Sequence, residues 1–197
     1  QMHGGRRLKR VLWMTALLIV LDQGTKLLAR AFLVGQRFEI LGGAFGLTYA
    51  ENPGFWLDNG LARKYILLLQ AITLFGLVAL LGLWALYRRY YRRSAWMDVA
   101  LACLLASAAG NMFLDRVIYG FVIDMFIIPY WVANMADLYS NLFILFFAVE
   151  FIVYPPGRRI LSWTPPREWG RETRFFVRFL RRELLRWWQS LSVRRPA

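Results

Sequence analysis

The sequence predicts an all-α membrane protein with four transmembrane helices, a small extracytoplasmic β-like segment and a C-terminal amphipathic helix. Three observations support this fold class. Of the 197 residues, 58% are hydrophobic and 17% are aromatic, which is too apolar for a soluble domain of this size. Four apolar runs reach the length of about 18 residues that a membrane span needs. Arginine and lysine gather between and beyond these runs, and the net charge is +13.

The four predicted spans are residues 11–33, 62–87, 95 to about 114, and 134–154. The first span is not a cleavable signal peptide, because its apolar run is too long and contains Asp22 and Lys26 in place of a small-residue cleavage site. We therefore expect this helix to stay in the mature protein.

The positive charges predict the orientation in the membrane. Basic residues precede the first span, join the second to the third, and fill the tail after the fourth. Cytoplasmic flanks of membrane proteins collect positive charge. Both termini are therefore expected to be cytoplasmic, with segments 34–61 and 119–133 on the outer side.

The outer segment after the first span differs from the helices. Residues 37–40 and 44–49 are short, partly alternating runs separated by Gly42 and Gly43, which favours a small strand pair on the membrane surface. Such strands can bind an extended peptide by strand addition. A connecting loop without a function of its own is the alternative interpretation.

Two acidic residues, Asp124 and Asp137, lie at the two ends of the second outer segment. Acids at the edge of a bilayer are costly to hold, so they indicate a candidate functional site. Two carboxyl groups held together do not both ionise readily. One then keeps a proton while the other can draw a proton from water, which makes that water nucleophilic towards a carbonyl. The alternative is that both acids only cap helices or face solvent.

Other kinds of chemistry have little support in the sequence. Cys103 is the only cysteine and His3 the only histidine, so a histidine-based metal site or a Ser-His triad cannot be assembled. No glycine-rich phosphate loop follows a strand. We expect no metal and no cofactor, and any hydrolysis must use carboxyl groups.

Four sequence blocks resemble the lipoprotein signal peptidase (signal peptidase II) family and stand in the family's order. They are Leu-Asp-Gln-Gly-Thr-Lys at 21–26, Tyr-Ala-Glu-Asn-Pro-Gly at 49–54, Gly-Asn to Asp-Arg and on to Asp124 at 110–124, and Asn-Met-Ala-Asp at 134–137. The resemblance covers residues 21–137, roughly 60% of the chain. Any one block is weak evidence, but four in order on a four-span chain are fairly specific.

The resemblance implies an intramembrane aspartyl endopeptidase of the bacterial cytoplasmic (inner) membrane. Its substrate partner would be a diacylglyceryl-modified prolipoprotein, cut before the lipid-bearing cysteine. The catalytic residues would be Asp124 and Asp137. Asparagine donors would orient the carboxylates, and Asp115 and Arg116 would pair and cap the third helix. The supporting or substrate-binding positions implied by the resemblance are Asp22, Lys26, Asn52, Gly54, Asn111, Asp115, Arg116 and Asn134.

One departure from the family concerns Asn111. Three residues separate Gly110-Asn111 from Asp115-Arg116, where the family's pattern has two. On an ideal α-helix the extra residue turns Asn111 by about 100° relative to Asp115. This predicts that Asn111 is poorly placed to orient an aspartate.

Other departures concern the substrate side. Phe55 and Trp56 follow Gly54, where the family has small residues, and Glu51 stands in place of an arginine. Ala133 replaces a typical phenylalanine, and the stretch between the two aspartates is short. A catalytically altered subunit or assembly factor of a larger membrane complex is therefore an alternative to the enzyme. A small transporter is a third class, but only Asp22 and Lys26 lie deep in a span.

The tail, residues 155–197, lies outside the resemblance and follows the membrane domain, residues 1–154. It holds eleven arginines against three glutamates, about +8 of the net charge. Apolar residues recur at helical spacing at Phe176, Leu180, Leu184, Trp187 and Leu191, while Arg174, Arg178, Arg181, Arg182 and Arg186 fall mainly elsewhere around the helix. This pattern predicts a helix on the cytoplasmic membrane surface that attracts anionic headgroups. No nucleic-acid recognition motif accompanies the charge, and we expect no nucleic-acid partner.

Overall fold

The computed structural model describes residues 2–53, 59–90 and 95–153, and in the tail residues 174–175, 177–179, 181–186 and 189. Four of its helical segments are long and apolar enough to cross a membrane: Arg6–Phe32, Tyr65–Arg88, Trp96–Ile118 and Met135–Val153. The four spans predicted from the sequence are confirmed.

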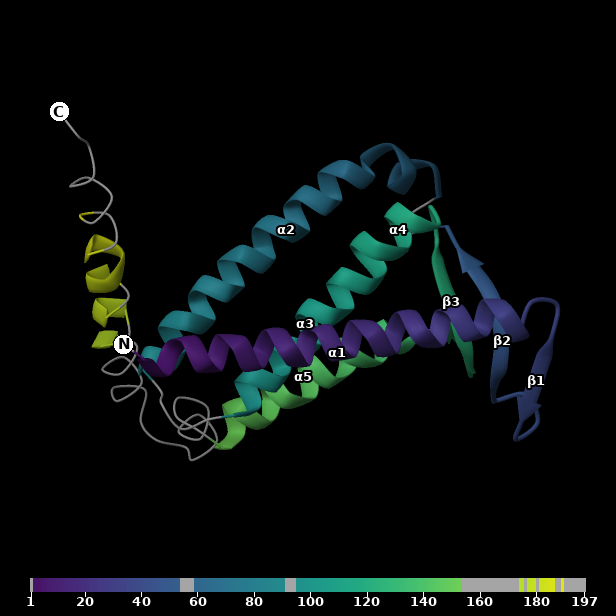
Figure 1. The fold of residues 1–197 in the computed structure, drawn as a ribbon, viewed down its shortest axis with the longest axis horizontal. Coiled ribbons are helices and arrows are strands. Elements are labelled where there is room, and N and C mark those ends of the chain that lie inside the picture. The colour runs from purple at the N-terminus through teal and green to yellow at the C-terminus, as the bar shows by residue number, and fades with distance from the viewer. Residues whose placement is uncertain are drawn as a thin grey trace.

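The helices form an elongated bundle with a small sheet at one end (Figure 1). They are α1 (Met2–Phe32), α2 (Asn59–Tyr90), α3 (Trp96–Ser107), the π-helix η1 (Ala108–Leu114), α4 (Asp115–Ile118) and α5 (Met135–Val153). Helix α3 packs mainly against α5 and α1 and touches α2 much less. Helices α3, η1 and α4 follow one another without a break, so the third span changes its helical pitch near the sheet end.

Small side chains let helix α3 approach its neighbours closely. Ala102, Cys103 and Ala106 are buried in α3, where they pack against residues of α1 and α5. Without a hydrophobic force between helices in lipid, close packing of small residues is a main source of association. Helix α2 instead leaves side chains such as Leu67 and Phe75 exposed, as expected for a surface that meets lipid.

The sheet has four antiparallel strands in the order β1-β2-β3-β4. The strands are β1 (Arg37–Ile40), β2 (Phe45–Asn52), β3 (Val122–Ile128) and β4 (Trp131–Ala133). The predicted strand pair at 37–40 and 44–49 is confirmed as β1 and β2. The turn between them contains Leu41, Gly42 and Gly43, all with positive φ.

Strands β3 and β4 were not predicted from the sequence, so the all-α expectation is incomplete. Strand β3 is a continuous apolar run that carries only one acid, and it lies between β2 and β4 with most of its residues buried. A strand covered on both faces does not alternate, so periodicity cannot distinguish it from a buried helical segment. The short stretch between the two aspartates is therefore a hairpin joined to the first one.

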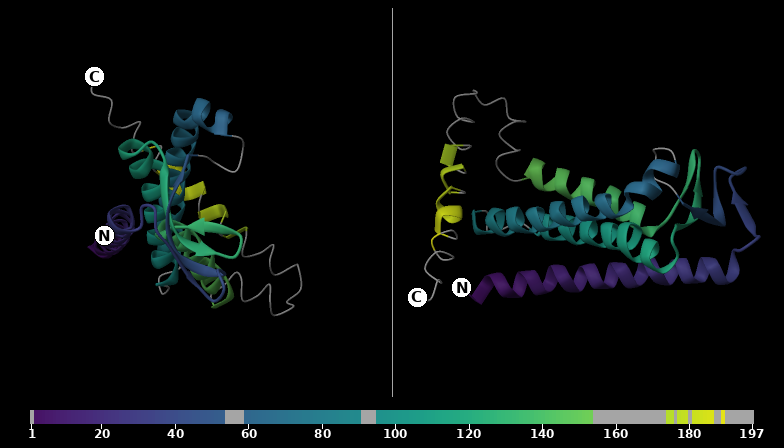
Figure 2. Two further views of the ribbon diagram at one scale, coloured as in Figure 1. Left: turned by 90° about the vertical axis from the view of Figure 1, so that its right-hand side faces the viewer. Right: turned by 90° about the horizontal axis from the view of Figure 1, so that it is seen from above.

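The described tail residues are helical and lie at the end of the bundle opposite the sheet, crosswise to the four spans (Figure 2). Phe175, Val177, Leu184 and Leu185 are exposed there. Other residues of the predicted apolar stripe, Phe176, Leu180, Trp187 and Leu191, lie outside the described residues.

Candidate active site

Strand β3 carries Asp124, and a bulge in β2 determines which side chains it meets. Leu47 lies opposite Phe126, but Ala50 lies opposite Asp124, so β2 has one extra residue between these pairs. A one-residue change of register reverses the face on which each following side chain lies. The bulge therefore brings Asn52 to the face of Asp124, where Asn52 Nδ2 donates to Asp124 Oδ2 at 3.0 Å.

Asp137 occupies the third position of helix α5 and takes part in a capping box with Asn134. The Asp137 amide donates to Asn134 Oδ1, and the Asn134 amide donates back to Asp137 Oδ2, both at 3.1 Å. This reciprocal pair satisfies amides that the first helical turn would leave without partners. The sequence alternative that the acid caps a helix is thus correct for Asp137, and the same hydrogen bonds orient its carboxyl group.

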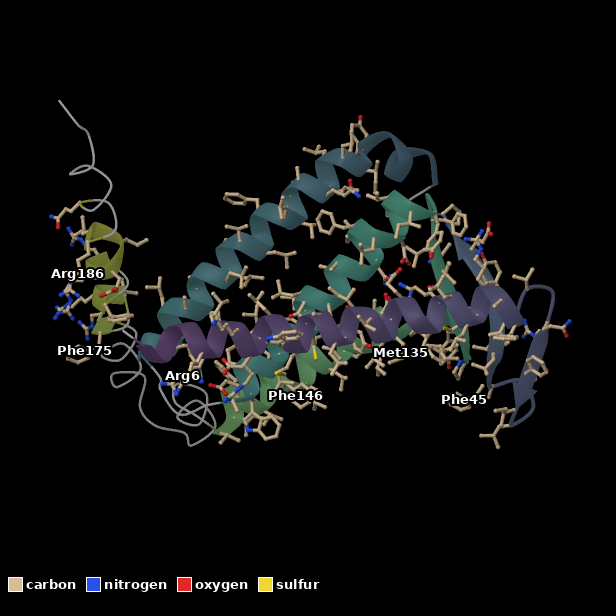
Figure 3. All side chains as sticks on the ribbon, viewed as in Figure 1. Arg6, Phe45, Met135, Phe146, Phe175 and Arg186 are labelled. Atoms are coloured by element: carbon tan, nitrogen blue, oxygen red, sulfur yellow. The ribbon has the colours of Figure 1, made fainter. Side chains whose placement is uncertain are left out.

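Asn134 joins the two acids. Its Nδ2 donates to Asp124 Oδ1 at 2.5 Å, while its Oδ1 and its amide hold Asp137. Asn134 and Asp124 are buried, with 1% and 4% of their surface exposed. The two carboxyl groups at the ends of the outer hairpin therefore converge on a single asparagine. Figure 3 shows oxygen and nitrogen atoms grouped near the labelled Met135, which follows Asn134.

Burial controls the protonation of Asp124. It raises the pKa of the Asp124 carboxyl group to about 6 from the ordinary 3.8, and the nearby Asp137 acts in the same direction. The donors Asn52 and Asn134 oppose this rise. Near neutral pH, Asp124 is thus a group that can gain or lose a proton.

A fully buried ion cluster lies beside the acid pair. Lys26 Nζ lies 2.8 Å from Asp22 Oδ2 and 2.8 Å from Asp115 Oδ2. Lys26 also donates to Asn111 Oδ1 at 3.0 Å, and Asn111 Nδ2 donates to Asp137 Oδ1 at 2.9 Å. Asn111 therefore connects the buried cation to one member of the acid pair.

Asp22 also reaches the start of α5. Its Oδ1 accepts a hydrogen bond from the Ala136 amide at 3.1 Å. The close approach depends on Gly110, because a Cβ atom at that position would lie 2.5 Å from Asp22 Oδ2. Helix α1 is thus tied to the first turn of the helix that carries Asp137.

The expectation that Asn111 is poorly placed was wrong, because the helix is not an ideal α-helix at this point. The extra residue lies within η1, where the Asp115 amide donates to Gly110 O in an i→i+5 bond. A π-turn holds one more residue than an α-turn. The added residue is absorbed inside the turn, and Asn111 still faces Lys26 and Asp137.

The other supporting residues behave differently from one another. Asp115 forms its ion pair with Lys26, whereas Arg116 Nη1 donates to Pro53 O at 2.8 Å. Arg116 thus ties the third span to the end of β2. Gly54, together with the neighbouring Phe55 and Trp56, lies outside the described residues.

Gln23 is a site residue that was not predicted from the sequence. Its Nε2 donates to Asp115 Oδ1 at 2.8 Å and to Asp22 Oδ2 at 3.1 Å. Its position next to Asp22, in an otherwise apolar span, is a signal that could have identified it, because a carboxamide in lipid needs partners. Among the described residues no group of three or more His, Cys, Asp or Glu side chains is arranged to hold a metal ion.

The fold and the site define a class of protein: a multi-pass membrane protein with a pair of acids where the spans meet a small sheet. Comparisons with known proteins agree with this class. The profile of the signal peptidase (SPase) II family matches residues 14–153, and the chain belongs to this family of bacterial lipoprotein-processing proteases.

Individual relatives and solved structures are similar over more than half of this chain. The lipoprotein signal peptidase of Pseudomonas putida is 34% identical over 125 residues, which cover 61% of this chain and 69% of the relative. That of Chromobacterium violaceum is 33% identical over 135 residues, 66% of this chain and 79% of the relative. Two structures described as a bacterial membrane enzyme, at 2.3 Å and 1.9 Å resolution, align with TM-scores of 0.57 and 0.55. Their identities are 22% and 21%, with 73% of this chain and 88% and 93% of those chains covered. At this identity they show likeness of fold.

Proposed function

We propose that the protein is an intramembrane aspartyl endopeptidase that uses Asp124 and Asp137. Its substrate would be a diacylglyceryl-modified prolipoprotein, and the bond cut would be the one before the lipid-bearing cysteine. The observation that carries this proposal is Asn134, whose side chain and amide hold both carboxyl groups in one hydrogen-bonded unit. A family member that had lost catalysis would have no need to keep this arrangement.

The two acids would share one proton. Asp124 is the favoured carrier, because burial raises its pKa to about 6. Asp137 is the favoured carboxylate, because it lies in the first turn of α5, where the helix dipole stabilises negative charge, and accepts bonds from Asn111 and the Asn134 amide.

The chemistry then follows from these charge states. Asp137 takes a proton from a water molecule, the oxygen of that water adds to the scissile carbonyl carbon, and Asp124 gives its proton to the carbonyl oxygen. When the tetrahedral intermediate collapses, the proton on Asp137 passes to the leaving nitrogen and Asp124 recovers its own from the intermediate. No atom outside the protein, the peptide and one water is required.

The proposed orientation follows from charge. The sheet end would face the outer side of the bacterial cytoplasmic membrane, because the end of α2 that carries Arg88 and Arg89 and the described arginines of the tail lie at the other end (Figure 2). A lipidated precursor diffusing in the outer leaflet would then meet the acids at the membrane surface.

The test is cleavage of a diacylglyceryl-modified precursor peptide by the purified protein. Asp124→Asn and Asp137→Asn should each abolish cleavage, since an amide is nearly isosteric but cannot exchange the proton. Glu39→Gln is the matched control, because it makes the same change on an exposed carboxylate of the same sheet. Substantial cleavage by either site variant would refute the acid pair. An inactive but folded wild type would favour the non-catalytic subunit.

We further propose that the tail helix binds anionic lipid on the cytoplasmic side. Arg178, Arg182 and Arg186 stand on one side of the helical wheel, and Leu184 stands on the other and is exposed. A nitroxide at Leu184→Cys, in a Cys103→Ser background, should become accessible to oxygen in nanodiscs containing anionic lipid. It should lose that accessibility in neutral nanodiscs or at high salt. Identical accessibility in both lipids would refute lipid binding, and loss of a co-purifying protein on deletion of residues 161–197 would instead indicate a docking role.

A further inference from the structure

A polar contact joins helix α2 to the site region of the third span. Gln70 Nε2 donates to the main-chain oxygen of Met112 at 2.7 Å. Met112 lies inside η1, one residue after Asn111. Gln70 is the only carboxamide side chain of the apolar span Tyr65–Arg88, where an amide without a partner would be costly.

The position of this bond matches a defect that the π-turn creates. The Asp115 amide bonds back to Gly110 O, an i→i+5 bond, whereas the Tyr119 amide bonds to Asp115 O, an i→i+4 bond. Between these two bonds, the amides of residues 116–118 are three donors for the four carbonyls of residues 111–114. The return from i→i+5 to i→i+4 bonding therefore leaves one of these carbonyls without a partner in the helix. Met112 lies in this interval, and a donor from outside the helix reaches its carbonyl. Buried main-chain oxygens that lack partners are rare because each costs free energy.

The same π-turn keeps Asn111 in place. Without it, the extra residue in this chain would rotate Asn111 by about 100° on an α-helix, away from Lys26 and Asp137, to which it is hydrogen-bonded. A turn that is less stable than α-helix therefore has to be held. The neighbouring residues of the bundle do not hold it by apolar packing alone, because Met112, Phe113 and Leu114 are all only half-buried.

We propose that Gln70 is a positioning residue. Its side chain donates a hydrogen bond to the Met112 carbonyl, and this bond stabilises the π-turn that orients Asn111 towards Asp137. Gln70 does not touch the acids. The inference rests on the proposed peptidase activity where it is tested by kcat, but not where it is tested by the infrared band of the acid pair. It assigns to α2, the span that packs least on the others, a part in setting the geometry of the site.

The experiment combines a substitution with a deletion. Gln70→Met keeps the length and removes the donor. Deletion of Phe113 restores two residues between Asn111 and Asp115, so that a regular α-helix can orient Asn111 and no carbonyl is skipped. Thr73→Val, one turn along α2, is the matched control, because it also removes a polar group from this half-buried side of the helix. Gln70→Met, the deletion and the variant with both changes are compared with wild type.

We expect Gln70→Met to lower kcat by about 5- to 10-fold, the effect of one net hydrogen bond, with KM unchanged. Thr73→Val should leave kcat unchanged. In the deletion background Gln70→Met should have no effect on kcat. Equal losses of kcat in the wild-type background and in a folded deletion background would show a general packing role and overturn the proposal. A kcat of Gln70→Met equal to that of wild type would overturn it as well.

A second readout needs no turnover. The infrared carbonyl band of protonated carboxyl groups reports the hydrogen bonding of the acid pair, and its assignment is checked with Asp124→Asn. Gln70→Met should shift this band in the wild-type background and leave it in place in the deletion background. An inactive wild type would therefore count against the peptidase proposal, while an unshifted band would count against Gln70.

Discussion

The two ends of the bundle both bury charged groups, but they arrange them differently. At the end opposite the sheet, Arg88 Nε lies 3.1 Å from Asp98 Oδ1, the Trp84 indole donates to the same oxygen, and Tyr87 donates to Glu150. These bonds run from α2 to α3 and from α2 to α5, so each joins a pair of helices. At the sheet end the bonds form one connected network that ends on two carboxyl groups. Figure 3 shows polar atoms at both places.

The difference lies in how many acids share one base and in where the bonds converge. The sheet end places four acids, Asp22, Asp115, Asp124 and Asp137, around the buried Lys26. At the other end, among the described residues, only the acids Asp98 and Glu150 lie near Arg88. Polar groups that only attach helices to one another need no such large excess of acids. An excess of acid raises the free energy of ionisation, and this is a cost that a proton-transfer site can use.

The largest effect should come from removing the shared base. Lys26→Met leaves Asp22 and Asp115 buried without their cation, and we expect a loss of about 3–5 kcal/mol in the free energy of unfolding, together with loss of cleavage. Arg88→Met at the other end removes a base that pairs with Asp98 and lies near Glu150, so it leaves fewer acids to share the loss. It should destabilise less and leave cleavage measurable. Denaturant unfolding in detergent micelles measures both, and equal effects at the two ends would contradict the distinction between them.

The second prediction concerns the pH dependence of stability. The folded pKa of Asp124 is raised to about 6 from 3.8, so the folded protein holds a proton that the unfolded chain releases between these values. The stabilisation from this proton is complete below about pH 4 and is lost as the pH rises through 6. Relative to Asp124→Asn, wild type should therefore lose about 2–2.5 kcal/mol between pH 4 and pH 7. Unfolding titrations at both pH values check this, with Glu39→Gln as the control that keeps the wild-type profile.

The third prediction concerns the close approach at Gly110. In Gly110→Ala the new Cβ atom would lie 2.5 Å from Asp22 Oδ2, so Asp22 must move away from Lys26 and the Ala136 amide. Overpacking of this kind costs about 1–3 kcal/mol, and cleavage should fall with stability. Gly76→Ala in α2 has open space around it and should gain up to about 1 kcal/mol from helix propensity. Similar results for the two glycines would show that the contact with Asp22 is unimportant.

The smallest effect should come from the end opposite the sheet. Tyr87→Phe removes the hydroxyl that donates to Glu150 Oε1 at 2.7 Å, one hydrogen bond worth about 1 kcal/mol. We expect a correspondingly lower free energy of unfolding and an unchanged kcat. A change in kcat would mean that the two polar clusters are coupled along the bundle.

The sequence was sufficient for the spans and for part of the site. Charge and apolar length predict the helices, and the glycines at 42 and 43 predict the β1–β2 turn. The strand that carries Asp124 was missed because a run buried on both faces has no period that separates strand from helix. The two acids were predicted to lie close together, but the hydrogen bonds of Asn134 that hold both carboxyl groups were not predicted.

Two details of the site depend on local geometry that residue spacing alone does not specify. The β2 bulge, which turns Asn52 towards Asp124, changes the register by one residue without any glycine or proline between Leu47 and Ala50. The π-helix changes the angle between Asn111 and Asp115, although the ideal-helix calculation predicted a displaced side chain. Both are one-residue irregularities, and each is visible only when neighbouring elements are in place.

The capping box of α5 makes the acid part of the helix start. Asn134 and Asp137 orient each other through the bonds that begin the helix, so the first turn cannot unwind without releasing the carboxyl group. Helix ends open at lower free energy than helix centres. Warming should therefore abolish activity at a lower temperature than it unfolds the bundle. The temperature of inactivation then reports the stability of the first turn of α5.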